Sequence, residues 1–478
     1  MFTNTRPIIP NDFWWHMAIG REIVNTGVIP AFDIYSYTML GESFSAYQRF
    51  WLSEIGLYGL YGLGGPELVI FVNSLMITSA YGLLLWLCRK ISKSWRISAV
   101  AVLFAVLLGI TNWTVRPQTT SILLGVIYLV AIYSYRTRPH SAWLALFPLG
   151  MLVWVNSHGS FVIGLVLIAI WIGDELWRLN AAHFKKESEK SLKMVKAAGL
   201  SFGMTLLASL VNPGMFGSWA YVRTMMSNPV IQNLVGEWAA PTLDSFWGAV
   251  FLISLLFSTA VLALSPKRPD FFQMATFIAF GILGFKTTRG VIWFGLVMAP
   301  IMSDHFSHLA ATIDSATKTS HKSNRSSVSN FLILIFLVAA AVFSLPWLRS
   351  IVPMYRRDAN LISSTTPIKA TQFLLEEDLP GELFNDMGFG SYLIWEGYPD
   401  YKVFADPRID LYPPEIWQDY LTVINAMPGW EKIMIRDNIN TVILNPEAEA
   451  ALVAALEGSP SWNIVYEDIT AVIFTRSD

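Results

Sequence analysis

Ten apolar stretches along the chain have the composition of helices that cross a bilayer. A hydrocarbon core about 30 Å thick is spanned by roughly 20 apolar residues in an α-helix, and by somewhat fewer inside a bundle. The stretches are 68–88, 97–110, 119–135, 142–155, 161–179, 197–211, 247–264, 271–285, 291–303 and 331–348. The pattern therefore predicts an α-helical polytopic membrane protein with about ten spans.

Two further apolar segments precede the first predicted span. Residues 13–25 are aromatic and amphipathic, and residues 51–63 are apolar but interrupted by glycines. Both segments are typical of helices that lie in the membrane interface without crossing it. Gly64, Gly65 and Pro66 follow, and such a sequence is expected to break the helix before the first span.

The pattern changes after about residue 350, where short apolar runs alternate with amphipathic ones. Strands are predicted at 382–384, 391–395, 402–405, 441–444, 464–467 and 471–475, and helices at 368–377, 414–427, 430–436 and 447–456. Helices placed between strands indicate a mixed sheet covered by helices. The predicted organisation is a first outer loop with interfacial helices (1–67), a transmembrane bundle (68–349) and an extracytoplasmic α/β domain (350–478).

The distribution of basic residues predicts the orientation in the membrane. If the loop after Cys88 is cytoplasmic, the loops on that side hold 17 Lys and Arg residues, and the opposite loops between spans hold 4. Because basic residues accumulate on the cytoplasmic side, this difference fixes the orientation. An even number of spans then places both the first 67 residues and the C-terminal domain outside.

Composition excludes several other classes of protein. The chain is 54% hydrophobic and 14% charged, which is too few charges for a soluble domain. Its net charge of −2 gives no electrostatic basis for binding nucleic acid. Cys88 is the only cysteine, so an intramolecular disulfide and a cysteine-rich metal site are excluded. We find no phosphate-binding glycine loop and no HExxH motif, and no cofactor is predicted, although a divalent cation bridging a phosphate and a carboxylate stays compatible with the sequence.

Polar side chains gather at the predicted outer ends of the spans and in the first outer loop. The candidates are Asp12, His16, Asp33, Glu54, Arg116, Gln118, Asn156, His158, Glu237 and Arg289. Ionisable groups at span ends are costly, and convergence of several segments on one face is typical of a binding site. Two arginines and two histidines beside carboxylates suit a phosphate-bearing substrate and a general base.

Each candidate also has a structural interpretation. Arg116 and Arg289 could anchor helix ends by extending to the interface. Asn156 could cap a tight turn, and Glu237 could be an interfacial anchor. Asp12 could cap a helix that starts at Phe13. No single residue decides between the structural and the functional interpretation, whereas the pattern of all of them together favours a substrate-binding site.

Several motifs resemble a bacterial branch of the GT-C membrane glycosyltransferases, a branch similar to the aminoarabinose and protein-mannosyl transferases. They are DFWWHMAIG at 12–20, DIYSYT at 33–38, WLSE at 51–54, RPQ at 116–118, NSHGSF at 156–161, EW at 237–238, the outer Arg289, FNDMGFGSYLIW at 384–395 and FADPRIDLY at 404–412. These motifs extend over nearly the whole chain.

The resemblance implies transfer of a sugar from a polyprenyl-phosphate donor to a glycan, lipid or protein acceptor at the outer face of the cytoplasmic membrane. It also implies an acidic catalytic residue early in the first outer loop. Asp12 fits that position best, Asp33 second and Glu54 third. His16, Arg116, Gln118, Asn156, His158, Glu237 and Arg289 are then expected to bind substrate. An inverting displacement is the expected reaction.

Two other functions remain as alternatives. One is a non-catalytic transport or assembly protein whose outer domain binds a partner, and the other is a ligase or polymerase of surface polysaccharide. Transporters place their charges near the bilayer midplane, whereas here they gather at one face, which favours chemistry at the outer surface. In the C-terminal domain, Asp406 and Arg408 are expected either to form a structural pair or to belong to a lid over the acceptor entrance.

Overall fold

The computed structural model describes residues 5–44, 47–182, 185–227, 236–317, 327–349, 351–352 and 360–477. The chain divides into two compact units. We call the first, Phe71–Leu345 with Met1–Thr5, the helical unit. The second, Arg6–Ile70 with Pro346–Asp478, is the α/β unit. The first 70 residues thus share a unit with the C-terminal part of the chain.

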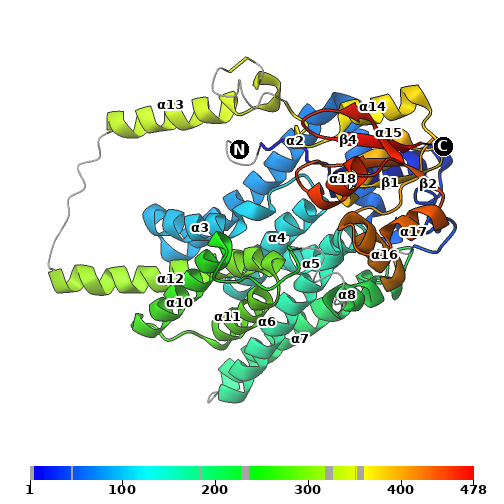
Figure 1. Cartoon of the computed structure of the whole chain (residues 1–478). Coiled ribbons are helices and arrows are strands. Elements are labelled where there is room, and N and C mark those ends of the chain that lie inside the picture. Colours follow the sequence, from blue (N-terminus) through cyan, green and yellow to red (C-terminus); the bar gives the residue numbers. More distant parts are fainter. Residues whose placement is uncertain are drawn as a thin grey trace. The chain divides into compact units, whose positions relative to one another are not determined.

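The helical unit consists of long apolar helices (Figure 1). They are the second part of α2 (Tyr47–Ser92), α3 (Trp95–Gly109), α4 (Gln118–Thr137), α5 (Ser141–Val155), α6 (Val162–Ala181), α7 (Lys185–Ala208), α8 (Gly217–Ser227), α10 (Phe246–Leu264), α11 (Phe271–Lys286), α12 (Val291–Thr317) and α13 (Ser327–Phe343). Short 3-10 turns precede or follow several of them: η1 (Ile110–Asn112), η2 (Gly159–Phe161) and η3 (Thr288–Gly290). A fourth, η4 (Pro346–Leu348), begins the second segment of the α/β unit.

Every one of the ten predicted spans overlaps a helix. Among the described residues, five helices are long and apolar enough to cross a membrane: Arg49–Ser92, Trp95–Asn112, Gln118–Thr137, Gly159–Ala181 and Phe246–Leu264. Three shorter apolar helices accompany them: Ser141–Val155, Phe271–Lys286 and Asn330–Phe343. The chain is therefore a multi-pass membrane protein, as its hydrophobic pattern predicts.

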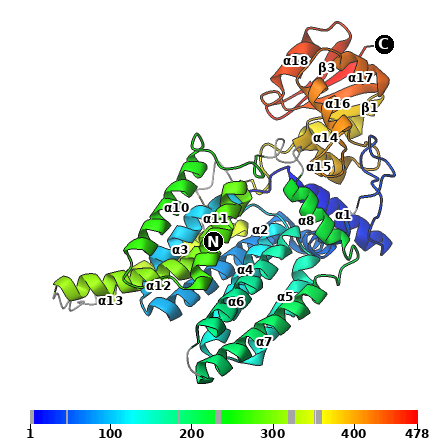
Figure 2. The ribbon, with the colours of Figure 1, turned by 90° about the horizontal axis from the view of Figure 1, so that it is seen from below.

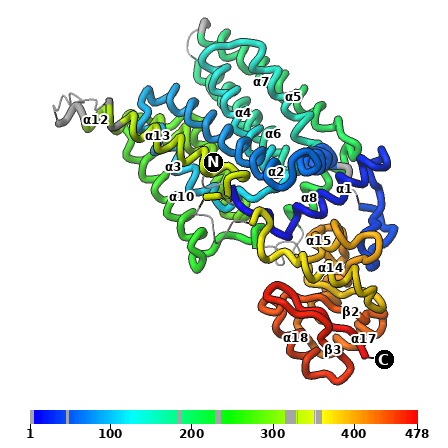
Figure 3. The backbone as a smooth tube through the Cα atoms, turned by 90° about the horizontal axis from the view of Figure 1, so that it is seen from above, coloured from blue at the N-terminus to red at the C-terminus, as the bar shows by residue number. Residues whose placement is uncertain are grey.

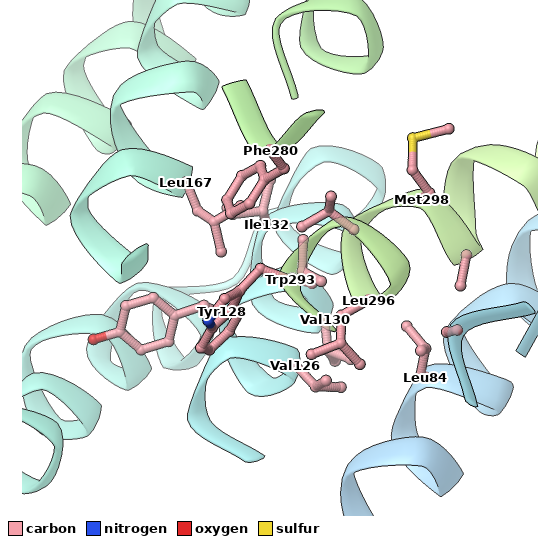
Figure 4. Packing of buried hydrophobic residues seen from close by; sticks show 14 of the residues in the cluster. Leu84, Val126, Tyr128, Val130, Ile132, Leu167, Phe280, Trp293, Leu296 and Met298 are labelled. Carbon is pink, nitrogen blue, oxygen red and sulfur yellow. The ribbon is translucent and has the colours of Figure 1, made fainter. Parts of the chain in front are cut away.

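Aromatic rings and glycines pack the helices of this unit closely together. Helices α4, α5, α6 and α7 lie side by side (Figure 3). Trp293 of α12 and Tyr128 of α4 lie in the buried cluster between the helices (Figure 4). A Cβ atom at Gly125 would lie 2.5 Å from the Trp293 ring, and one at Gly164 would lie 2.7 Å from the Tyr128 ring. Only glycine permits these approaches, because protein interiors leave no spare volume.

Helix α2 is broken where the sequence predicts it. Gly64 and Gly65 have non-helical backbone angles, and Gly65 combines φ 61° with ψ −163°. This region of backbone space is open almost only to glycine. Pro66 then begins the second part of the helix, where its missing N–H is not needed. The break separates a first segment in the α/β unit from the apolar stretch that enters the bilayer.

The α/β unit holds a four-stranded sheet with helices around it (Figure 2). Its elements are α1 (Asp12–Thr26), the first part of α2, α14 (Ile368–Glu377), β1 (Glu382–Asn385), α15 (Met387–Gly397), α16 (Pro414–Ile424), α17 (Trp430–Arg436), β2 (Ile439–Leu444), α18 (Ala450–Glu457), β3 (Trp462–Glu467) and β4 (Val472–Arg476). The strand order is β1-β2-β4-β3. β1 pairs parallel with β2, and the other pairs are antiparallel. Mixed pairing agrees with the predicted α/β domain.

Two predicted strands of this unit are wrong. Residues 391–395 lie in helix α15, because Asp386 accepts hydrogen bonds from the backbone N–H groups of Gly388 (2.6 Å) and Phe389 (3.2 Å) and so starts a helix. Residues 402–405 form only an isolated bridge between Val403 and Ser36. This segment is held instead by side chains, such as the amide oxygen of Asn385, which accepts from the Phe404 N–H at 2.9 Å.

Helix α1 differs from the predicted interfacial helix because its aromatic face is buried inside the α/β unit. Trp14 is 1% exposed and meets the Tyr392 ring edge to face, with the ring centroids 5.1 Å apart. The backbone N–H of Trp15 donates to the hydroxyl of Ser391 at 2.9 Å, and Arg21 lies over the Trp395 ring. The helix thus packs on α15, and its amphipathic pattern reflects a protein core.

Candidate functional site

Two arginines of the helical unit share one carboxylate. Arg116 lies before α4, and its Nη1 donates to both oxygens of Glu237, at 2.9 and 2.7 Å. Arg289 of η3 donates from Nε to Glu237 Oε2 at 2.7 Å. The backbone N–H of Arg289 also donates to the carbonyl of Glu237 at 3.0 Å. The structure therefore brings together three predicted substrate-binding residues from three separate segments, which we call the arginine cluster.

The arginine cluster carries a net positive charge. Burial by itself raises the pKa of Glu237, but the charges of Arg289 and Arg116 and their hydrogen bonds outweigh burial and lower it to about 2. Glu237 is therefore an anion at every physiological pH, and one carboxylate faces two guanidinium groups. Arginine forks of this kind bind carboxylates and phosphates in the same geometry.

A cavity of about 400 Å³ opens beside the arginine cluster. Its walls are apolar and come largely from α6, α8 and α11: Val162, Ile163, Val166, Val222, Met225, Met226, Ala279, Phe280 and Leu283. Its polar lining comes from Gln118, His158, Ser160, Tyr221, Thr287 and Arg289. A long apolar cavity with convergent polar groups is the usual form of a site for an amphipathic ligand.

His158 contributes a neutral ring to this lining. Its Nδ1 accepts the backbone N–H of Ser160 at 3.1 Å, so the hydrogen-bond pattern assigns the ring proton to Nε2. Burial, together with the charges of Arg289 and Arg116, lowers the pKa of His158 to about 3. His158 is thus a hydrogen-bond donor without charge under physiological conditions.

The two predicted amides have different surroundings. Gln118 lines the cavity and donates to Asn112 Oδ1 at 3.3 Å. Asn156 donates to the carbonyls of Leu152 (2.8 Å) and Val211 (2.9 Å), which ties the end of α5 to the turn after α7. The geometry of Asn156 therefore corresponds to the structural interpretation, a residue that closes a helix end.

Asp33 lies in the α/β unit and is completely buried. It forms an ion pair with Arg408, and its Oδ2 accepts from the Ser36 N–H at 2.9 Å and from the Ser36 hydroxyl at 2.6 Å. Arg408 in turn donates to Asp406 at 2.6 Å, so the predicted structural Asp406–Arg408 pair is confirmed. Burial raises the pKa of Asp33, but Arg408 and the Ser36 hydrogen bonds outweigh burial and hold it below its ordinary value.

Glu54 and His16 form a second buried pair in the same unit. His16 Nδ1 and Glu54 Oε1 are 3.0 Å apart, and the residues are 4% and 0% exposed. The Trp15 ring covers the imidazole, with the centroids 3.5 Å apart. The pair joins α1 to the first part of α2.

Asp12 is the one partly exposed carboxylate among the three predicted catalytic residues. It is the first residue of α1, and Asn11 occupies the N-cap position. The prediction that Asp12 could be the cap of a helix starting at Phe13 is therefore wrong by one position. A carboxylate in the first turn is favoured by the helix dipole, and Asp12 is only half-buried.

The sequence did not single out Tyr221 or Thr287, and it named Trp238 only as part of the EW motif, although all three line the cavity. Arg289 lies over the Trp238 ring, 5.1 Å from its centroid. Such stacking of a cation on an aromatic ring is a tertiary contact that leaves no local pattern in the sequence. Within the residues that the structure describes, no three His, Cys, Asp or Glu side chains gather into a metal-binding group.

The fold, a bundle of apolar helices together with an α/β unit, is similar to the folds of two solved membrane proteins. The oligosaccharyltransferase AglB from Archaeoglobus fulgidus, solved with an inhibitory peptide and a dolichol-phosphate, superposes with a TM-score of 0.55 and 13% identity over 98% of this chain and 71% of that chain. The oligosaccharyltransferase of the same organism in its apo form superposes with a TM-score of 0.55 and 12% identity, over 94% of this chain and 68% of that chain.

ArnT from Cupriavidus metallidurans in the apo state gives a TM-score of 0.50 and 14% identity over 98% of this chain and 94% of that chain. No family model matches this chain, and no curated protein matches it. At identities this low the likeness concerns the fold. It confirms the predicted fold class, a polytopic helical protein with an α/β part.

Proposed function

We propose that this chain is a membrane glycosyltransferase that moves a sugar from a polyprenyl-phosphate donor to an acceptor at the outer face of the cytoplasmic membrane. The observation that carries the proposal is the cavity of the helical unit, which joins apolar walls to Arg289 and His158. A polyprenyl phosphate likewise has an apolar part, its prenyl chain, and a charged part, its phosphate. The AglB structure contains a dolichol-phosphate, which belongs to this chemical class.

The two parts of the donor match the two parts of the cavity. The prenyl chain lies against the apolar side chains of α6, α8 and α11. The phosphate lies at Arg289, with the Nε2–H of His158 as a neutral donor. Arg289 is the guanidinium group that lines the cavity, and Glu237, its ion-pair partner, is shared with Arg116.

The proposed reaction is an inverting displacement. The acceptor hydroxyl transfers its proton to the carboxylate of Asp12, and its oxygen forms a bond to the anomeric carbon as the bond from that carbon to the phosphate oxygen breaks. Polyprenyl phosphate leaves with the electron pair. Arg289 and His158 stabilise its negative charge, so the leaving group needs no proton.

Burial distinguishes Asp12 from the other two carboxylates. Asp33 is enclosed by Arg408 and Ser36, and Glu54 is enclosed by His16 and the Trp15 ring. A general base must reach the proton that it removes. We therefore assign the base to Asp12 and structural roles to Asp33 and Glu54.

The test uses the purified full-length protein in lipid nanodiscs with a panel of polyprenyl-phosphate sugars. We expect at least one donor to release polyprenyl phosphate in the presence of a hydroxyl acceptor, and Arg289→Gln to abolish this release. Lys286→Gln is the matched control, because Lys286 is exposed and outside the cavity lining. Failure of the protein to bind any polyprenyl phosphate would refute the proposal.

A further inference from the structure

The turn between β3 and β4 is held by hydrogen bonds and exposes the side chain of Ile469. Asp468 accepts from the backbone N–H groups of Thr470 and Ala471, at 2.7 and 2.8 Å, and from the Tyr466 hydroxyl at 2.7 Å. The Thr470 hydroxyl donates to the carbonyl of Ser364 at 2.9 Å, which fixes the turn against the segment before α14. Ile469, between these two polar residues, is 93% exposed.

Exposed apolar residues are common on protein surfaces, so the position of Ile469 is what matters. Ile469 and Pro66 line the same cavity of the α/β unit, which has a volume of about 820 Å³. Pro66 is the residue at which the second part of α2 begins, and the apolar stretch of that helix starts two residues later. This cavity therefore connects Ile469 with the start of the predicted span at 68–88.

The surroundings of Ile469 have the character of a membrane interface. Leu63, three residues before Pro66 on the other side of the break in α2, is 82% exposed. Lys369 lines the same cavity and is exposed, and a lysine at a membrane surface attracts anionic lipid headgroups. On β3, which leads to the turn, Ile464 is 45% exposed.

We infer that the β3–β4 turn is a second membrane contact of the α/β unit. Ile469 inserts its side chain into the bilayer interface, and Lys369 faces the headgroups. The occupant is lipid because the surface is continuous with a helix that enters the bilayer at Pro66. This inference concerns a different surface from the donor cavity and does not depend on the proposed reaction.

The test exploits the single cysteine of the chain. Cys88 is buried, and Cys88→Ser gives a cysteine-free background. A bimane label is attached at Ile469→Cys, and separately at Glu457→Cys as the matched control. Glu457 is exposed and ends α18, which precedes β3, whereas Ile469 follows the far end of that strand. The full chain is placed in nanodiscs of phosphatidylcholine and phosphatidylglycerol with brominated acyl chains.

We expect brominated lipid to quench the label at position 469 several-fold more than the label at position 457. Equal quenching at the two positions overturns the inference. Protection of the 469 label from both brominated lipid and aqueous iodide also overturns it, because a protein would then cover the turn. Ile469 is almost fully exposed, so its substitution leaves the folded unit intact.

Discussion

Arg408 forms a buried ion pair with Asp33, which lies 375 residues earlier in the chain. The same guanidinium group donates to Asp406, so it bridges two carboxylates inside the α/β unit. The Tyr412 hydroxyl donates to Asp406 as well. Removing one partner from such a network leaves a buried charge without full compensation, which makes the Asp33–Arg408 pair a sensitive connection between the two chain segments of this unit.

Asp33→Asn is expected to destabilise the protein by about 3–5 kcal/mol, because it leaves Arg408 with an incomplete set of buried partners. Thermal unfolding in detergent measures the loss. Turnover per folded molecule is expected to stay close to that of the wild type. A variant with normal thermal stability and no turnover would instead give Asp33 the catalytic role.

Acid is expected to weaken the same connection. The pKa of Asp33 is lower in the folded protein than its ordinary value, so the folded state favours the anion. Its contribution to stability is therefore complete above about pH 4 and is lost as the pH falls through the folded pKa. Unfolding temperatures measured from pH 7 down to pH 3 should show this loss. The fall in unfolding temperature at low pH should be smaller in Asp33→Asn than in the wild type. An equal fall in both proteins would contradict the stabilising role of the Asp33 anion.

Asp12→Asn is expected to lower turnover by roughly 10²–10⁴-fold with normal folding, because the amide cannot accept the acceptor's proton. Release of polyprenyl phosphate measures turnover, and thermal unfolding measures folding. Asp244→Asn is the matched control, since Asp244 is an exposed acid in the segment before α10. Normal turnover of Asp12→Asn would show that Asp12 is not the general base and that a different group activates the acceptor hydroxyl.

Arg289→Gln is expected to weaken binding of a polyprenyl phosphate by about 10- to 150-fold, which corresponds to the loss of a charge-assisted hydrogen bond of about 1.5–3 kcal/mol. Titration of a fluorescent prenyl phosphate measures the dissociation constant. Arg289→Lys keeps the positive charge but loses the two-pronged guanidinium geometry, so its dissociation constant should lie between those of the wild type and Arg289→Gln. If Arg289→Gln and Lys286→Gln bind equally well, the phosphate lies elsewhere.

A larger side chain in the apolar wall is expected to select against long donors. Ala279→Trp fills part of the cavity between α6 and α11, so activity with a long prenyl chain should fall much more than activity with a short one. Comparing farnesyl and undecaprenyl donors measures the effect. Ile282→Trp is the control on the exposed side of the same helix, where Ile282 is 62% exposed. Equal losses with both donors would argue that the chain does not enter this cavity.

The helices could be predicted because long apolar stretches permit few alternatives in a membrane protein. Residues 391–395 show the limit of that reasoning. Their run of apolar and aromatic residues favours a strand, but the capping by Asp386 and the packing of α15 on α1 decide for a helix. Local pattern and tertiary context compete in short segments, and context prevails.

The candidate site was predictable to a similar extent. The positions of Arg116, Glu237 and Arg289 at helix ends identify them as one outer group, and the structure brings them together. Nothing in the sequence pairs Asp33 with Arg408, because contacts between distant residues leave no local pattern. The Asp33–Ser36 spacing was the available signal, since an aspartate that accepts from the residue three positions on is typical of a structural turn.

The division of the α/β unit into two chain segments has a consequence for biosynthesis. Residues up to Ile70 leave the ribosome before the roughly 275 residues of Phe71–Leu345, and their partners from Pro346 onward come last. At about 5–20 residues per second, the first segment waits about 15 seconds to a minute. During that interval the carboxylate of Asp33 has no Arg408, and the aromatic face of α1 has no α15 to cover it. A chaperone or the membrane surface that shelters α1 in that interval would therefore determine how much of the newly made protein completes its fold.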